Sequence, residues 1–189
     1  MLLVAGVAAS VMMQVMNTMQ NQALQTGQDT IRDISSGLRV TQISGYANST
    51  KITQLGLFVT TTAGSEAIDL SSTTLSLSDT NVQSILNYDS DSFSDSVSNG
   101  LFNTINSSNL TSSKFGLIVI RDADSSCTVS SPSINSGDLV VLIVNSTKCF
   151  SGIDVRTKFT GKIIPERGIN GMIGFTTPNV FVDTIIELS

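Results

Sequence analysis

MLLVAGVAASVMMQVMNTMQNQALQTGQ, residues 1–28, contains no charged side chain, and its first half is almost wholly apolar. Further on, Ile31, Ile34 and Leu38 continue as a single apolar stripe. The pattern predicts one helix over residues 1–38, about 60 Å long. Because this is longer than a small domain needs for its own core, the helix is expected to pack against copies of itself or to anchor in a membrane. The apolar positions at helical spacing, which we predict to be the assembly face, are Val4, Val7, Ala8, Val11, Val15 and Met19.

The apolar opening has two other interpretations, a secretory signal peptide and a membrane span. A signal peptide begins with basic residues and ends at a small-residue cleavage site, and neither feature stands out here. As a membrane span, residues 1–16 would reach only about 24 Å, whereas the hydrocarbon core of a bilayer is about 30 Å thick. We therefore expect a tail helix whose first turns precede Met1.

From Arg39 onward the composition changes to short runs of Val, Ile, Thr and Phe separated by Gly, Ser, Asn and Asp, which is typical of strands. The segment 81–101 is predicted to hold a short helix or a mobile Ser/Asp loop. The whole pattern predicts an α+β chain: a long N-terminal hydrophobic α-helix, residues 1–38, followed by a β-sandwich (Ig-like) head, residues 39–189. The candidate strands are Arg39–Tyr46, Ile52–Thr62, Thr73–Ser78, Phe115–Arg121, Leu139–Val144, Thr157–Ile164, Gly171–Thr176 and Phe181–Leu188.

Composition excludes several classes of function. Only 13% of the 189 residues are charged, and the net charge is −5. The ten basic residues are scattered, which argues against a nucleic-acid partner. Histidine is absent, so neither a Ser-His-Asp triad nor a His-ligated zinc can form. The sequence has no nucleophile elbow, P-loop or dinucleotide-binding motif, and paired carboxylates alone are weak support for a glycosidase. We predict a protein that is not an enzyme and requires no cofactor.

The two cysteines, Cys127 and Cys149, are compatible either with unrelated buried thiols or with a disulfide. The surrounding composition favours a disulfide, which would stabilise the fold by about 3 kcal/mol. Four N-x-[ST] sequons favour a glycosylated surface protein, although a chain rich in Asn, Ser and Thr also produces sequons by chance. The predicted glycosylation sites are Asn48, Asn106, Asn109 and Asn145.

Two acidic segments are candidates for a metal site. Asp122 and Asp124 place two carboxylates on one side of a turn, and a hard cation such as Ca²⁺ binds oxygen ligands of this kind. The alternative is that both are solvated turn residues, because Asp favours turns. The second segment, with Asp89, Asp91 and Asp95, fails the EF-hand pattern at its sixth and twelfth positions, so a solvated acidic loop is expected there.

A family resemblance is carried by three stretches: MLLVAGVAASV with TGQDTIRDISSGLRV, FGLIVIRDADSSC with NSGDLVVLIVN, and PERGINGMIGFTTPNVFVDTIIELS. They resemble, in that order, the tail helix and its passage into the head, paired head strands, and the C-terminal end of the archaellins. Archaellins are the archaeal flagellins and are related to the type IV pilins. Their precursors carry a basic leader that a prepilin-type peptidase removes. The resemblance implies that Met1 corresponds to a position inside the mature tail helix.

The resemblance also implies a function, that of a structural subunit of the archaeal flagellum, or archaellum. Tail helices would form the filament core, and heads would form an extracellular shell. The implied partners are further copies of the chain, sister archaellins in a mixed filament, and the membrane before assembly. A divalent metal at Asp122 and Asp124 is implied as well, because archaellin heads often carry one at such a loop. Two alternatives stay open: an adhesive pilus subunit of the same superfamily, and a membrane-tethered surface glycoprotein.

Overall fold

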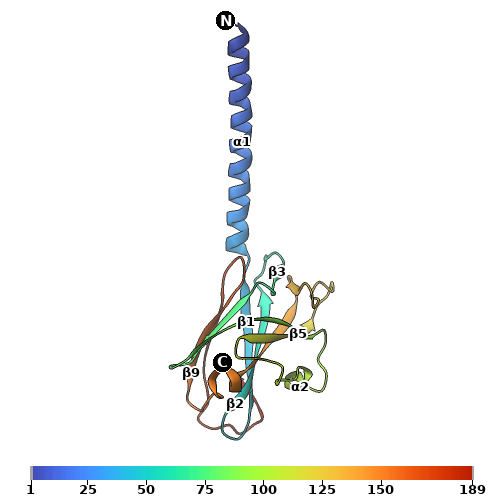
Figure 1. The fold of residues 1–189 in the computed structure, drawn as a ribbon, viewed down its shortest axis with the longest axis vertical. Helices are drawn as coiled ribbons and strands as arrows, with labels where there is room; N and C mark the ends of the chain where they lie inside the picture. Colours follow the sequence, from blue (N-terminus) through green and yellow to red (C-terminus); the bar gives the residue numbers. More distant parts are fainter. Residues whose placement is uncertain (1, 189) are drawn as a thin grey trace.

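The N-terminal segment forms one long helix that stands clear of a β-rich head (Figure 1). The computed structural model of the protein describes residues 2–188. Helix α1, Leu2–Ser35, has 34 residues and is therefore about 51 Å long. Ala, Leu, Met and Gln, which favour helices, are frequent in it. The predicted tail helix is confirmed, but it ends at Ser35 rather than at residue 38, because Leu38 begins a strand and is buried in the head.

The head is built from short strands, most of which belong to one sheet in the order β10-β9-β4-β5-β6-β8-β2-β1-β11. Neighbouring strands are antiparallel except β5 and β6, which are parallel. The sheet curls, so that Leu38 N–H donates to the carbonyl of Ile169, just before β10, over 3.1 Å. The elements are β1 Leu38–Ala47, β2 Ile52–Thr61, β3 Ile68–Asp69, β4 Thr74–Ser78, β5 Gln83–Ser94, α2 Leu101–Thr104, β6 Lys114–Arg121, β7 Ser133–Ile134, β8 Leu139–Asn145, α3 Ser146–Phe150, β9 Lys158–Ile164, β10 Gly171–Thr176 and β11 Ile185–Leu188.

The central strands β6 and β8 are buried on both faces. Their inner face belongs to the main core of the head, where Leu117 and Leu142 are fully buried. On the outer face, Ile118 and Ile143 lie in a second cluster with Phe102 of α2. Burial on both sides explains why these two strands are continuous apolar runs in the sequence rather than alternating ones.

The segment 81–101 corrects the prediction of a short helix or mobile loop, because most of it forms β5 between β4 and β6. Its Ser, Asn and Asp content concealed the strand. Ser84 and Leu86 are nevertheless buried, whereas Ile85 between them is exposed, which is the alternation of a strand. Two neighbouring strands use both of its backbone edges, and this pairing outweighs the weak β-propensity of its residues.

The predicted fold class, a long hydrophobic helix followed by a mostly β head, is confirmed. The sandwich differs in one respect, since nine of its strands are joined in one curled sheet rather than divided between two large sheets, and within the described chain only β3 and β7 form a separate small pair. The last strand is also shorter than predicted and begins at Ile185 rather than at Phe181. Across residues 2–188, no helix is long and apolar enough to cross a membrane.

Candidate functional site

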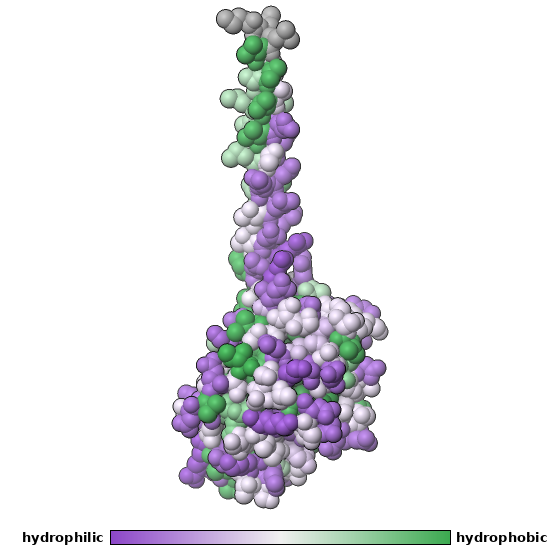
Figure 2. Space-filling view, viewed as in Figure 1, coloured by the Kyte–Doolittle hydropathy of each residue, from purple (hydrophilic) through white to green (hydrophobic). Residues whose placement is uncertain are grey.

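The first candidate site is the surface of α1, whose apolar side chains lie in water in the single chain. Val11 is 53% exposed, and the other predicted assembly residues are exposed to a similar or greater extent. Figure 2 shows that apolar residues gather on the distal half of the helix and polar residues nearer the head. Burying one such side chain contributes about 1.5–3 kcal/mol. A large exposed apolar surface marks an interaction site, so this helix has the properties of an assembly surface. The predicted assembly residues are Val4, Val7, Val11, Val15 and Met19.

Two further properties of α1 suit burial among other helices. Its first charged side chain is Asp29, so the preceding turns can leave water without the cost of a buried charge, which is several kcal/mol per ion. Met12, Met13 and Met16 are exposed as well. Methionine is unbranched and adapts to irregular gaps between packed helices. The helix surface can therefore fit neighbours whose registers differ slightly.

The second candidate site is a cluster of three carboxylates at one end of the head. Asp122 and Asp124 follow β6, and Asp138 immediately precedes β8, which pairs with β6. One ligand oxygen from each of the three lies within 4.8 Å of the others. The structure therefore brings the two predicted residues together and adds a third that the sequence analysis missed. The available signal was the turn NSGD before an apolar strand, which places Asp138 at the same end of the sheet as Asp122.

The hydrogen bonds of the cluster leave one oxygen without a partner. Asp122 accepts from Cys127 N–H at 2.9 Å, and Asp124 accepts from the Asn135 side-chain amide at 2.7 Å. Asp138 is only 1% exposed, and its Oδ2 accepts from Asn135 N–H at 2.9 Å. Its Oδ1 is buried and has no hydrogen-bond partner within the described chain. A buried carboxylate oxygen costs free energy unless a cation or a donor satisfies it.

The electrostatics of the cluster also fit a cation. A hydrogen bond from Ser126, joined by one from Asn135, holds the pKa of Asp124 below its usual value. Three carboxylates this close repel one another, and a divalent cation removes that repulsion. Calcium needs six to eight oxygen ligands, so backbone carbonyls and water would complete the set. The geometry of the three residues is compatible with a hard cation, and the metal site at Asp122 and Asp124 stays a prediction.

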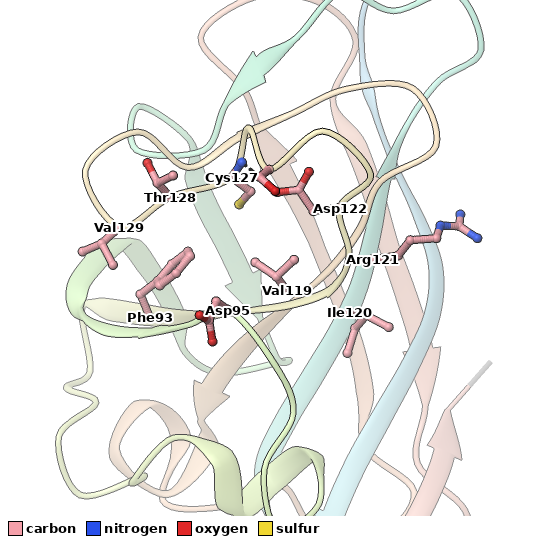
Figure 3. Close-up of a pocket in the computed structure, with 10 residues that line it drawn as sticks. Phe93, Asp95, Val119, Ile120, Arg121, Asp122, Cys127, Thr128 and Val129 are labelled. Carbon is pink, nitrogen blue, oxygen red and sulfur yellow. Dashed lines mark hydrogen bonds between the residues drawn. The ribbon is translucent and has the colours of Figure 1, made fainter.

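A pocket of about 720 Å³ lies beside the cluster, lined by Phe93, Val119 and Val129 together with polar residues that include Asp122. Figure 3 shows the Asp122 carboxylate next to Cys127, whereas Arg121 extends away from the other labelled side chains. The guanidinium Nε of Arg121 donates to the Gly137 carbonyl at 2.6 Å, so it holds the β7–β8 turn rather than neutralising the cluster.

The predicted disulfide is wrong in this structure: Cys127 and Cys149 are both free and buried. The sulfur of Cys149, in α3, lies 3.7 Å from the carbonyl of Ser112, while Cys127 forms a β-bridge with Pro132 in the loop that follows β6. Burial raises the pKa of Cys127 to about 12, with the charge of Asp122 adding to the effect, and burial raises that of Cys149 to about 11. Both are the unrelated buried thiols that the sequence left as the alternative.

The four sequons divide into three exposed sites and one buried site. Asn48, Asn106 and Asn109 are exposed. Asn145 is only 7% exposed, and its side-chain amide, the group to which a glycan would attach, donates to the Ser107 carbonyl at 2.8 Å. Its Oδ1 accepts from Lys148 N–H and caps α3. This burial disfavours glycosylation of Asn145 in the folded chain, and the predicted site there stays a prediction.

The second acidic segment is also not the solvated loop that the sequence suggested, because Asp89 is buried. Its Oδ1 accepts from Lys114 Nζ at 2.7 Å, and its Oδ2 accepts from Ser92 at 2.9 Å. The strand pair β5–β6 brings these residues together, so the function of Asp89 is structural. Asp91 and Asp95 remain exposed.

These features define a class of protein: a subunit with a folded β head and a long helix whose turns before Asp29 are uncharged and suited to burial among other molecules. Residues 1–175 match the family model of the archaeal-type flagellins. The chain is 37% identical to flagellin B2 of Methanocaldococcus jannaschii over 192 residues, which is 100% of this chain and 88% of that protein. It is likewise 37% identical to flagellin B5 of Pyrococcus abyssi over 205 residues, or 100% of this chain and 92% of that one.

Solved structures agree. The crystal structure of archaeal flagellin FlaB1 from M. jannaschii is similar with a TM-score of 0.73 and 33% identity, covering 81% of this chain and 96% of that one. The archaeal flagellum of Methanospirillum hungatei shares the fold, with a TM-score of 0.65 at 16% identity over 99% of this chain and 91% of that one. The chain belongs to the archaeal-type flagellin family. It is a structural subunit of the extracellular archaellum filament and not an enzyme, as the resemblance predicted.

Proposed function

We propose that the subunit polymerises through α1, whose apolar turns pack side by side with those of other copies to form the filament core. The observation that carries this proposal is that the described apolar residues before Asp29 are exposed in the single chain. Because head-to-head contacts between parallel copies do not close into a ring, the product is a helical polymer that the base of the organelle can rotate for swimming.

The experiment is a deletion strain complemented with this chain. Negative-stain microscopy of sheared surface material tests for filaments, and a swimming assay tests their use. Filaments with restored swimming are the expected result. Filaments that restore surface attachment but not swimming would identify an adhesive pilus instead, and monomeric subunit without filaments would identify a tethered glycoprotein.

We also propose that Asp122, Asp124 and Asp138 hold Ca²⁺ or a similar divalent cation that stabilises the β6–β8 end of the head. The support is the buried Oδ1 of Asp138 together with the 4.8 Å grouping. Calcium at a hundred times its dissociation constant should stabilise the head by about 2.7 kcal/mol. Thermal unfolding of chelator-treated protein, with and without added calcium, measures this effect. Asp138→Asn should abolish the shift, whereas Asp183→Asn, on an exposed residue, should preserve it.

Glycans are proposed on at least two of the exposed asparagines Asn48, Asn106 and Asn109. All three lie in turns or loops rather than inside strands. The intact mass of native subunits should exceed the 20.0 kDa of the sequence. A native mass equal to that value would contradict the proposal.

Two further partners are proposed from the apolar tail and from the family. Before assembly the apolar turns of α1 associate with the membrane, and cell fractionation should then recover unassembled subunit with membranes. Sister archaellins share the filament, and mass spectrometry of sheared filaments should then find more than one flagellin. Recovery of soluble precursor, or of a single flagellin, would contradict the respective proposal.

A further inference from the structure

The joint between α1 and the head leaves little freedom, because only Ser36 and Gly37 separate the last helical residue from β1. The backbone carbonyls of Ser35, Ser36 and Gly37 all accept hydrogen bonds from the head. The carbonyls at the end of a helix have no partner within the helix, so each of these bonds ties the helix end directly to the head. The joint is a set of fixed contacts rather than a loose linker.

One side of the joint is formed by the loop between β9 and β10. Ile169 N–H donates to the Ser36 carbonyl at 2.8 Å, and Leu38 N–H donates to the Ile169 carbonyl at 3.1 Å. Gly168 has a φ of +93°, which favours glycine, and a Cβ at this position would lie only 2.3 Å from the Ser36 oxygen. Only glycine lets this loop come so close to the end of the helix.

The other side of the joint is formed by the segment that follows β2. Thr62 N–H donates to the Gly37 carbonyl at 2.9 Å, and its hydroxyl donates to the Ser35 carbonyl at 3.2 Å. Glu66 N–H donates to the Ser36 hydroxyl at 3.3 Å. The helix end is therefore held from two directions by segments that are far apart in the sequence.

Side chains of α1 also contact the head and favour one rotation of the helix about its own axis. Arg32 Nε lies 2.9 Å from Glu66 Oε1, and Asp29, Arg32 and Asp33 line a shallow pocket with Arg167 of the β9–β10 loop. At 3.6 residues per turn, these charged residues share one face of the helix. The exposed apolar residues of the same part of the helix lie on the opposite face, at Leu24, Ile31 and Ile34.

We infer that this joint, formed by residues 35–38, Thr62, Glu66 and Gly168–Ile169, sets the rotation of α1 about its axis relative to the head. Leu24, Ile31 and Ile34 are thereby presented to the tail of a second copy in one register, and the charged face is kept out of the filament core. Turning the helix by one residue, about 100°, would begin to move charged side chains toward the core, where a charge without a partner is unfavourable. The inference rests on the proposed packing of tails in the core. It implies that the joint determines the rise and twist between neighbouring subunits of the filament.

The test compares two glycine substitutions in cells that assemble the full chain. Gly168→Ala places a methyl group against the Ser36 carbonyl, whereas a methyl group in Gly174→Ala, on β10, would meet no described atom within 4 Å. Rise and twist per subunit are measured by electron microscopy of sheared filaments, and subunit abundance is measured in whole cells. Gly174→Ala should give wild-type filaments, while Gly168→Ala should shift the twist or abolish filaments although the subunit accumulates.

Thr62→Val covers the case in which Gly168→Ala fails to accumulate. It keeps the shape of the side chain and removes only the hydroxyl that binds the Ser35 carbonyl, so a smaller shift in twist is expected. Unchanged rise and twist in Gly168→Ala, or in Thr62→Val if the former does not accumulate, would overturn the inference. Failure of the wild-type chain to form filaments would instead contradict the proposed function.

Discussion

The tail and the head of this subunit use the hydrophobic effect in opposite ways. The head hides its Leu, Ile, Val and Phe side chains within its own curled sheet, where many are fully buried. The tail exposes the same kinds of side chain, with Val11 half in water and Met12 more so. The first arrangement stabilises a single chain, whereas the second lowers the free energy only when copies meet. One chain thus separates the residues that fold it from the residues that assemble it.

Charge follows the same division. The tail carries no charged side chain before Asp29, whereas the head holds most of the charged residues, including the buried Asp89 and its exposed partner Lys114. A paired charge can be retained in a folded domain, because its partner is fixed by the same fold. In a core made from many copies, an unpaired charge would recur at every subunit. Charge is therefore absent from the turns of the tail before Asp29 and is confined to the turns next to the head.

The largest effect is expected for a charge placed in the tail. Val11→Asp should abolish filaments while leaving the head folded, because a carboxylate in the water-excluded core costs several kcal/mol for every added copy. The matched control is Val182→Asp, in which the same substitution is made at a head residue that is 87% exposed. Filament number and length by electron microscopy measure both. Normal filaments from Val11→Asp would contradict the burial of the tail in a water-excluded filament core.

The head should fold without the tail. A fragment of residues 36–189 keeps the buried Leu38 and should be soluble, monomeric and β-rich by circular dichroism. The expectation follows because the core is formed by head residues and none of its members lies in α1. A largely unfolded fragment would show that the head does not fold independently of the tail.

Truncating leucine or isoleucine side chains should separate the two regions further. Leu142→Ala, at a fully buried position of β8, should lower the free energy of unfolding of the head by about 2–5 kcal/mol. Ile31→Ala, at a tail residue that is 67% exposed, should leave that free energy unchanged and affect assembly only. The free energy of unfolding of each variant is measured by denaturant unfolding of the full chain in detergent, with the β-structure of the head followed by circular dichroism. Equal losses from the two substitutions would contradict the division.

The smallest effect is expected for the stability of the head at acidic pH. Burial by itself raises the pKa of Asp89, but hydrogen bonds from Lys114 and Ser92 outweigh it and hold that pKa below the usual 3.8. The ionised form is thus favoured in the folded head, so its stabilisation is present above pH 3.8 and is lost as the pH falls through the lower, folded-state pKa. Asp89→Asn should lower stability at neutral pH by about 1.5–3 kcal/mol. It should also flatten the loss of stability in acid, as measured by unfolding at a series of pH values. An acid profile identical to that of the wild type would show that other carboxyl groups control it.

The tail helix, the β head, the family and the absence of common catalytic groups could all be predicted from the order of the amino acids. These follow from patterns that are local in the chain: the helical spacing of Val4 to Met19, the apolar runs of β6 and β8, and the missing histidine. Such local patterns predict the structure reliably, because they reflect the backbone geometry of each element and the burial of one of its faces.

Other features depend on neighbours that are distant in the chain, and these features became visible only in the folded structure. β5 is a strand because β4 and β6 pair with it, and Asp138 joins Asp122 because β6 and β8 are adjacent. The cysteines are both free although their spacing allowed a bond, and Asn145 is buried although its sequon is intact. In each case the deciding term is a hydrogen bond or a packing contact between residues far apart in the chain, which spacing along the sequence does not encode.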